Sequence, residues 1–223
     1  MNPELIELTP NSESDRALFL DRDGTLILYH GNNGDPNRVE LIPGAAEGLE
    51  LALLAGYRLF LLTNQGGVGL GLFSEEDVQA VHDRMFEMLG IPEGLFTEIC
   101  VATEAPPKIQ EGVSDTETTK VARAATRSPF ARQVLTPFEP IVADRWRKPS
   151  PRFLVEAMER YALDPAACFM VGDREADWRC GLAAGVQSIA VRTGAELTAE
   201  HEVWLAENRV PIFRQFYSFA RTL

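Results

Sequence analysis

Residues 17–25 read ALFLDRDGT, and this stretch decides the fold. Its apolar run ends in Asp21, as a buried parallel strand does when it delivers its last residue to a site. Asp23 follows two positions later, and the chain turns at Gly24, so both carboxylates can point into one pocket. We therefore expect a strand over residues 17–21 with two acids at its carboxyl end.

Strand-like and helix-like segments alternate along the rest of the chain. Further strands are predicted at residues 58–64, 97–102, 168–173, 187–194 and, as an edge strand, 210–213. Helices are predicted at residues 44–54, 74–89, 150–161, 176–184 and 197–207. This order predicts a single α/β domain over residues 1–223, a Rossmann-like, doubly wound parallel sheet of five to six strands flanked by helices.

Polar residues stand at the carboxyl ends of three of the predicted strands. Asp21 ends the first strand, Thr63 and Asn64 end the second, and Asp173 ends the fourth. Because an open parallel sheet binds its ligands at the carboxyl ends of its strands, these side chains should meet at one edge of the sheet.

The residue types at that edge suit phosphoryl transfer. Asp21, Asp23 and Asp173 offer hard oxygen ligands of the kind that Mg²⁺ prefers. A carboxylate can attack a phosphate to form an aspartyl-phosphate, while a neighbouring acid protonates the leaving oxygen. The hydroxyl of Thr63 and the N–H groups of the glycines that follow it suit phosphate oxygens, and Lys148 supplies a fixed positive charge.

Each of these motifs also has a structural interpretation when it stands alone. Paired aspartates occur in turns, glycine-rich turns often follow strands, and most lysines are solvated. The combination is specific because acid, hydroxyl, lysine and acid follow one another in this order, each at a strand end or a helix start.

In this order, the motifs resemble those of the haloacid dehalogenase (HAD) superfamily of phosphatases, over roughly residues 17–192. The four motifs correspond to Asp21–Thr25, Thr63-Asn64, Lys148, and Gly172-Asp173 with Asp177. DRDGT, TNQ before a glycine-rich turn, FSEEDVQAVHDRM and RKPSP are similar to the branch of histidinol-phosphate and heptose-bisphosphate phosphatases.

The resemblance implies a catalytic pair and a Mg²⁺ site. Asp21 would be the nucleophile and a metal ligand. Asp23 would be the general acid/base, with its main-chain carbonyl on the metal, and Asp173 would complete the protein ligands. Arg22, between the two acids, would point away from the site.

The resemblance also implies a phosphate-binding set. Thr63, Asn64 and Lys148 would hold the phosphate, and Arg147 would lie near the substrate. Asp177 would orient Lys148 or a water molecule at the metal rather than bind the metal itself.

Two departures from that branch concern the substrate. Many of its members carry a Cys/His zinc loop just before the lysine motif, but residues 104–147 contain neither Cys nor His. Leu70 stands where heptose-bisphosphate phosphatases tend to have a basic residue.

Residues 104–147 are predicted to form a loop or small lid insert in place of a large cap domain. Their basic residues either meet a second anionic group of the substrate or form a solvated face (Lys120, Arg123 and Arg127).

Composition narrows the class of ligand and the compartment. The formal net charge of -12 argues against nucleic-acid binding, because a polyanion would be repelled. The three cysteines are far apart, the first residues are not a signal peptide, and no apolar run is long enough to span a bilayer. We expect a cytoplasmic protein that binds no membrane; its oligomeric state stays open.

The sequence therefore predicts a Mg²⁺-dependent phosphomonoester hydrolase that acts on a small phosphorylated metabolite, of the sugar phosphate or histidinol phosphate type. Two alternatives remain at this point. A polynucleotide 3′-phosphatase would share the four motifs but needs a basic groove. A non-catalytic binding protein on the same scaffold cannot be separated from an enzyme by fold alone.

Overall fold

The structure is a computed structural model that describes residues 13–31, 34–91, 93–105 and 146–223. The predicted insert over residues 104–147, including Lys120, Arg123 and Arg127, lies outside the described residues except at its two ends. The choice between a lid and a loop therefore stays a prediction.

The described strands form a parallel sheet in the order β3-β2-β1-β4-β5-β6. Their bounds are β1 Ala17–Leu20, β2 Arg58–Asn64, β3 Phe96–Ala102, β4 Cys168–Gly172, β5 Gln187–Val191 and β6 Ile212–Phe213. The chain order reverses beside β1, which lies between β2 and β4, and an open parallel sheet places its ligand site at such a point. The predicted doubly wound α/β fold is confirmed.

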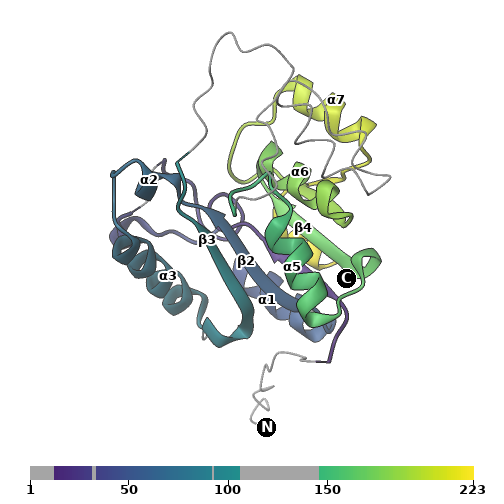
Figure 1. Cartoon of the computed structure of the whole chain (residues 1–223), viewed down its shortest axis with the longest axis horizontal. Coiled ribbons are helices and arrows are strands. Elements are labelled where there is room, and N and C mark those ends of the chain that lie inside the picture. Colours follow the sequence, from purple (N-terminus) through teal and green to yellow (C-terminus); the bar gives the residue numbers. More distant parts are fainter. Residues whose placement is uncertain (1–12, 32–33, 92, 106–145) are drawn as a thin grey trace.

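Helices cover both faces of the sheet (Figure 1). Their bounds are α1 Ala45–Leu54, α2 Gly66–Gly69, α3 Glu75–Leu89, α5 Arg152–Tyr161, α6 Glu175–Ala184, α7 Ala199–Glu207 and α8 Phe216–Ala220. Ser74 caps α3 by accepting a hydrogen bond from the main chain of Asp77, and Gly90 ends the helix in a left-handed conformation, both as the sequence predicts.

Alternate strand residues point to two separate hydrophobic layers. On one face, Leu18, Leu20 and Leu61 are fully buried and pack with apolar side chains of α1, α3 and α8. On the other face, Phe19, Phe60 and neighbouring strand residues pack against α5. This period of two in a sheet that is covered on both sides explains why the strands read as continuous apolar runs.

Two helices were not predicted from the sequence. The glycine-rich turn after β2 contains the single-turn helix α2, and α8 follows the edge strand β6. The fully buried ring of Phe216 anchors α8, and it fits because Gly48 of α1 has no side chain: a Cβ there would lie 2.8 Å from the ring. Neither helix is long enough to give a periodic pattern.

Within the described part of the chain, no helix is both long enough and apolar enough to cross a membrane.

Candidate active site

The polar strand ends meet in one cleft. Its volume is about 480 Å³, and all of the predicted site residues line it: Asp21, Asp23, Thr63, Asn64, Arg147, Lys148, Asp173 and Asp177. Asp21 directly follows the central strand, and its main-chain N–H donates to the carbonyl of Val171 on β4. The topology therefore joins residues that are more than a hundred positions apart in the sequence.

Lys148 is the charged centre of the site. Its side chain is 2% exposed, and Nζ donates to Oδ1 of Asp21 at 2.6 Å and to the carbonyl of Leu62 at 2.7 Å, while Oδ1 of Asp177 lies 2.7 Å away. Burial alone would favour a neutral amine, but the charges of Asp177 and Asp21 outweigh it and raise the pKa of Lys148. The ammonium is therefore permanently charged and fixed in direction.

Asn64 holds the main chain of Lys148. Its side-chain amide donates to the carbonyl of Lys148 at 3.0 Å, and its side-chain oxygen accepts from the N–H of Lys148 at 2.9 Å. Both ends of the amide are thus engaged across 84 positions of sequence. In this arrangement Asn64 fixes the lysine relative to β2, and its direct contact with phosphate stays a prediction.

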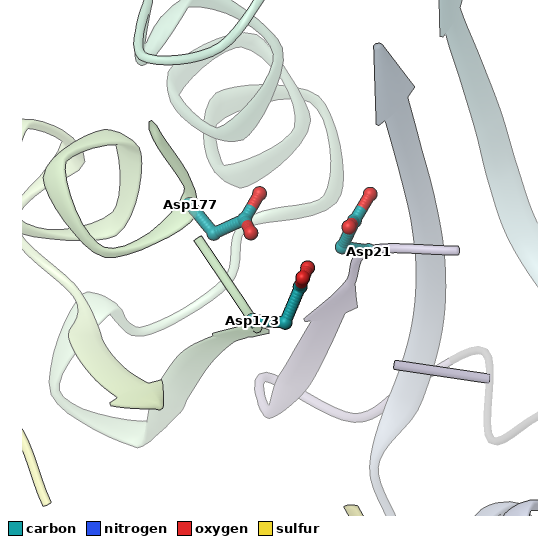
Figure 2. A group of neighbouring side chains, drawn as sticks. All are labelled: Asp21, Asp173 and Asp177. Carbon is teal, nitrogen blue, oxygen red and sulfur yellow. The ribbon is translucent and has the colours of Figure 1, made fainter. Parts of the chain in front are cut away.

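Three carboxylates face one another at the ends of β1 and β4 and the start of α6 (Figure 2). One oxygen from each of Asp21, Asp173 and Asp177 lies within 4.8 Å of the others, and all three side chains are buried. Burial, followed by the negative charges of Asp21 and Asp177, raises the pKa of Asp173 to about 8. Burial likewise raises the pKa of Asp21, although the charge of Lys148 opposes the shift.

This cluster fits a divalent cation. Oδ2 of Asp173 accepts from the N–H of Ala195 at 2.6 Å, but its buried Oδ1 has no hydrogen-bond partner among the described residues. The negative charges of neighbouring buried carboxylates repel one another, and one of their oxygens lacks a hydrogen-bond donor. Carboxylate oxygens are hard ligands, and a bound Mg²⁺ would supply the positive charge that offsets this repulsion. In Asp177 both oxygens are engaged, Oδ1 by Lys148 and Oδ2 by the N–H of Arg174, so this side chain is the least free of the three to bind a metal.

Two glycines allow the main chain to approach Asp173. Gly24 has a φ of 85°, and a Cβ built on it would lie 2.6 Å from the carboxyl carbon of Asp173. A Cβ on Gly194 would lie 2.1 Å from Oδ2 of the same side chain. The loops after β1 and β5 therefore enclose this carboxylate closely, which explains its burial.

Asp23 stands apart from the three clustered carboxylates. Its Oδ2 accepts hydrogen bonds from Nε of Arg22 and Nε2 of Gln65, each at 2.9 Å. Arg22 is not among the residues that line the cleft, but its buried guanidinium contacts the carboxylate of Asp23, which does line it. Sequence reasoning missed this contact, and it also missed Gln65, whose place after the Thr63-Asn64 pair was the available signal.

Further basic and aromatic groups line the cleft. Arg147 is half-buried there, beside Trp146, whose ring packs under the guanidinium of Arg152 at 4.1 Å. The guanidinium of Arg174 lies 4.2 Å from the ring centre of Tyr29. Arg174 and Tyr29 were not predicted as site residues, although Arg174 directly follows Asp173, the acid just after β4.

Comparisons with known proteins find a matching family model and relatives that are phosphatases. A family model described as HAD-hydrolase-like matches residues 145–214. A D-glycero-D-manno-heptose-1,7-bisphosphate 7-phosphatase of Chlorobaculum tepidum is 31% identical over 201 residues, which cover 86% of this chain and 87% of that relative. A D-glycero-beta-D-manno-heptose-1,7-bisphosphate 7-phosphatase of Rhodopseudomonas palustris is 29% identical over 179 residues, which cover 80% and 84% of the two chains.

A solved structure shares the fold. The D,D-heptose 1,7-bisphosphate phosphatase of B. bronchiseptica, crystallised with magnesium and phosphate, aligns with a TM-score of 0.66 at 22% identity, covering 93% of this chain and 97% of the other. At this identity the likeness supports the architecture alone.

Proposed function

This chain belongs to the haloacid dehalogenase superfamily of phosphatases, and from that membership we propose that it removes one phosphate from a small sugar bisphosphate through an aspartyl-phosphate on Asp21. The observation that carries the proposal is the position of Lys148. One buried ammonium joins Asp21 and Asp177 at the carboxyl edge of the sheet, beside Asp173.

In the first proposed step, a carboxylate oxygen of Asp21 attacks the phosphorus. The bond from phosphorus to the substrate oxygen breaks, and that oxygen takes a proton from Asp23. Lys148 lies within hydrogen-bond distance of Asp21, so its charge is near the oxygens of the transferring phosphate. Thr63 provides a buried hydroxyl on the same edge of the sheet.

In the second proposed step, Asp23 takes a proton from water as the water attacks the phosphorus. Inorganic phosphate leaves, and Asp21 is regenerated as a carboxylate. The same residue thus acts first as an acid and then as a base.

We propose that Mg²⁺ is held by Asp21, Asp173 and the main-chain carbonyl of Asp23, while Asp177 orients Lys148. When bound, the cation would neutralise charge on the carboxylates and the phosphate, so that an anionic nucleophile can approach an anionic ester. The unsatisfied Oδ1 of Asp173 supports this assignment.

The substrate proposal rests on the names of the relatives and on the cleft. Both reported relatives are named as 7-phosphatases of a heptose 1,7-bisphosphate. The cleft places the basic side chains of Arg147 and Arg174 near the carboxylates, where a second phosphate would need positive charge. The exposed Leu70 and the lack of Cys and His in residues 104–147 distinguish this chain from typical members of that branch.

A phosphatase assay with a short panel tests the proposal. The panel is D-glycero-D-manno-heptose 1,7-bisphosphate, fructose 1,6-bisphosphate, histidinol phosphate and a 3′-phosphorylated oligonucleotide, each with Mg²⁺ and with EDTA. We expect Mg²⁺-dependent release of phosphate from a sugar bisphosphate, and none from Asp21→Asn. Turnover of the oligonucleotide or histidinol phosphate in preference to both sugar bisphosphates would contradict the substrate class, and equal activity of Asp21→Asn would contradict the mechanism.

A further inference from the structure

One wall of the cleft carries no polar side chain. Residues 66–73, which follow the carboxyl end of β2 and include α2, read GGVGLGLF, and we call this segment the apolar wall. Four of its residues line the cleft: Gly66, Gly67, Leu70 and Phe73. A leaving group that lies against this wall therefore meets apolar side chains and main-chain atoms.

The main chain of the apolar wall offers few donors to a ligand. The N–H groups of residues 68–72 all donate to carbonyl groups of the protein, at 2.8–3.1 Å. One of these bonds joins Gly69 to Thr103, just after β3, and another joins Leu70 to Gly66. A substrate hydroxyl buried against this segment would lose water without gaining one of these donors, which is unfavourable. The wall therefore suits C–H groups better than hydroxyl groups.

Leu70 is the exposed apolar side chain of this wall inside the cleft. It is 59% exposed, and Phe73 is half-buried. A single exposed leucine is ordinary on a protein surface, and Leu72, at 57%, is an example that does not line the cleft. Leu70 differs because it shares the cleft with an aromatic ring, as apolar residues do in sites that bind small molecules.

Two glycines allow the ring of Phe73 to pack closely. A Cβ on Gly67 would lie 2.2 Å from the ring, and a Cβ on Gly34, between β1 and α1, would lie 2.7 Å from the Cβ of Phe73. The side chain is therefore packed between two segments of main chain. Together with the hydrogen bonds of residues 68–72, this packing means that the wall is formed before a substrate binds, which lowers the entropy lost on binding.

The cleft differs on the two sides of its central strand. The sheet order places β2 on one side of β1 and β4 on the other. Leu70 and Phe73 follow β2, whereas Arg174 follows β4, where its guanidinium lies 4.2 Å from the ring centre of Tyr29. A leaving group with a C–H face on one side and a negative charge on the other matches this distribution.

We propose that Leu70 is a specificity-determining residue: with Phe73 it packs against C–H groups of the leaving group, so that the enzyme selects phosphate esters whose leaving group is apolar on the β2 side. The inference rests on the proposed function, which places the transferred phosphate at Asp21. For a sugar bisphosphate, it means that C–H groups of the sugar, and not its hydroxyl groups, face Leu70.

Alkylphosphonates of increasing length provide the test. Their phosphorus–carbon bond is not an ester bond, so they are not hydrolysed by the proposed chemistry, and their anionic head resembles the phosphate of the substrate. Isothermal titration calorimetry with Mg²⁺ gives Kd for methyl-, propyl- and pentylphosphonate in wild type, Leu70→Ala and Leu72→Ala. Leu72→Ala is the matched control, because Leu72 is almost as exposed as Leu70 but does not line the cleft.

Full burial of a methylene group strengthens binding about fourfold, and an alkyl chain that contacts the wall on one side should gain about half of that free energy, or about twofold. We therefore expect the affinity of wild type to rise about 15-fold from methyl- to pentylphosphonate. In Leu70→Ala this rise should fall to about fourfold, and in Leu72→Ala it should equal that of wild type. Methylphosphonate, which is too short to reach the wall, should bind the three proteins within about twofold of one another.

The sugar substrate gives a second readout. The KM for heptose 1,7-bisphosphate should rise about fivefold in Leu70→Ala, with a smaller effect on kcat, and should stay at the wild-type value in Leu72→Ala, since lost apolar contact with the leaving group weakens binding of the substrate and transition state alike. This readout decides the question if wild type hydrolyses the sugar but binds no phosphonate.

Three outcomes would overturn this inference alone, with turnover of a sugar bisphosphate intact: an affinity of wild type that does not depend on chain length, the same dependence in Leu70→Ala, or an unchanged KM in that variant if no phosphonate binds. A loss of affinity in Leu70→Ala that is equal for all three phosphonates would also overturn it, because the side chain would then serve the fold. Wild type that neither binds a phosphonate nor hydrolyses a sugar bisphosphate would refute the proposed function and this inference with it.

Discussion

Replacing Asp173 with asparagine separates two effects of this carboxylate: the free energy that burying its charge costs the fold, and its proposed role as a metal ligand. The substitution keeps an oxygen that can accept from the N–H of Ala195, and it puts an amide where Asp21 and Asp177 now face a third carboxylate. The shape of the side chain is nearly unchanged, so the loops around Gly24 and Gly194 should keep their close approach.

The magnitude follows from the titration of Asp173. The fold raises its pKa from 3.8 to about 8, so between these values the folded protein binds more protons than the unfolded chain, and stability falls as the pH rises. At about 1.4 kcal/mol per pH unit, the full shift sets an upper bound of about 6 kcal/mol at pH 8. Because Asn also loses the attraction of the carboxylate to Arg174, we expect a net gain of about 2 kcal/mol in metal-free protein, or roughly 4–8 °C in Tm.

The assay is thermal unfolding in EDTA at pH 6.5 and pH 8, then at pH 8 with added Mg²⁺. Metal-free wild type should have a lower Tm at pH 8 than at pH 6.5, and Asp173→Asn should lose most of this difference. Mg²⁺ at ten times its dissociation constant should stabilise wild type by about 1.4 kcal/mol and leave the variant unchanged. Asp164→Asn, which replaces a capping carboxylate outside the cleft, is the control and should behave as wild type. A variant that is less stable than wild type at pH 8 without metal would refute this reasoning.

Three further predictions concern the surroundings of the site. Lys148→Met leaves Asp21 and Asp177 without their shared cation, so we expect a loss of about 3 kcal/mol in the free energy of unfolding by urea titration; wild-type stability would contradict it. Burial keeps His82 neutral, with its pKa lowered to about 4, so wild type should lose up to about 3 kcal/mol of stability as the pH falls from 6.5 to 4, measured by urea titration at several pH values. His82→Phe should remove this loss, and an unchanged pH profile would disprove it. In Gly172→Ala the new Cβ would lie 2.3 Å from the carboxyl carbon of Asp177, so we expect about 2 kcal/mol of destabilisation and a lower kcat, whereas wild-type values of both would speak against the contact.

The sequence predicted those features that depend on local chemistry. The strand over residues 58–64 matches β2 because its apolar run and flanking polar residues mark both ends. The helix after Ser74 matches α3 because the N-cap, the acidic first turn and the glycine that ends the helix all lie within seventeen positions of the sequence. The convergence of Asp21, Thr63 and Asp173 also followed, because parallel topology alone brings the carboxyl ends of neighbouring strands together.

The remaining features depend on contacts between distant segments. Nothing near Asn64 in the sequence shows that its side-chain amide forms hydrogen bonds with the main chain of Lys148, 84 positions away. The direction of the Arg22 side chain was equally hidden, because neighbouring residues at a turn can face the same or opposite sides. The helix α8 is too short to carry a periodic pattern, and its burial depends on Gly48 of α1.

The covalent phosphate on Asp21 is the central proposed intermediate, and the most direct measurement is to trap it. Wild-type enzyme turning over heptose 1,7-bisphosphate with Mg²⁺ is quenched in acid and reduced with borohydride, which converts an aspartyl-phosphate to homoserine. Peptide mass spectrometry should then find homoserine at position 21 in wild type, and none in the Asp21→Asn protein or in the presence of EDTA. Homoserine at another aspartate, or none at position 21 while phosphate is being released, would contradict the account.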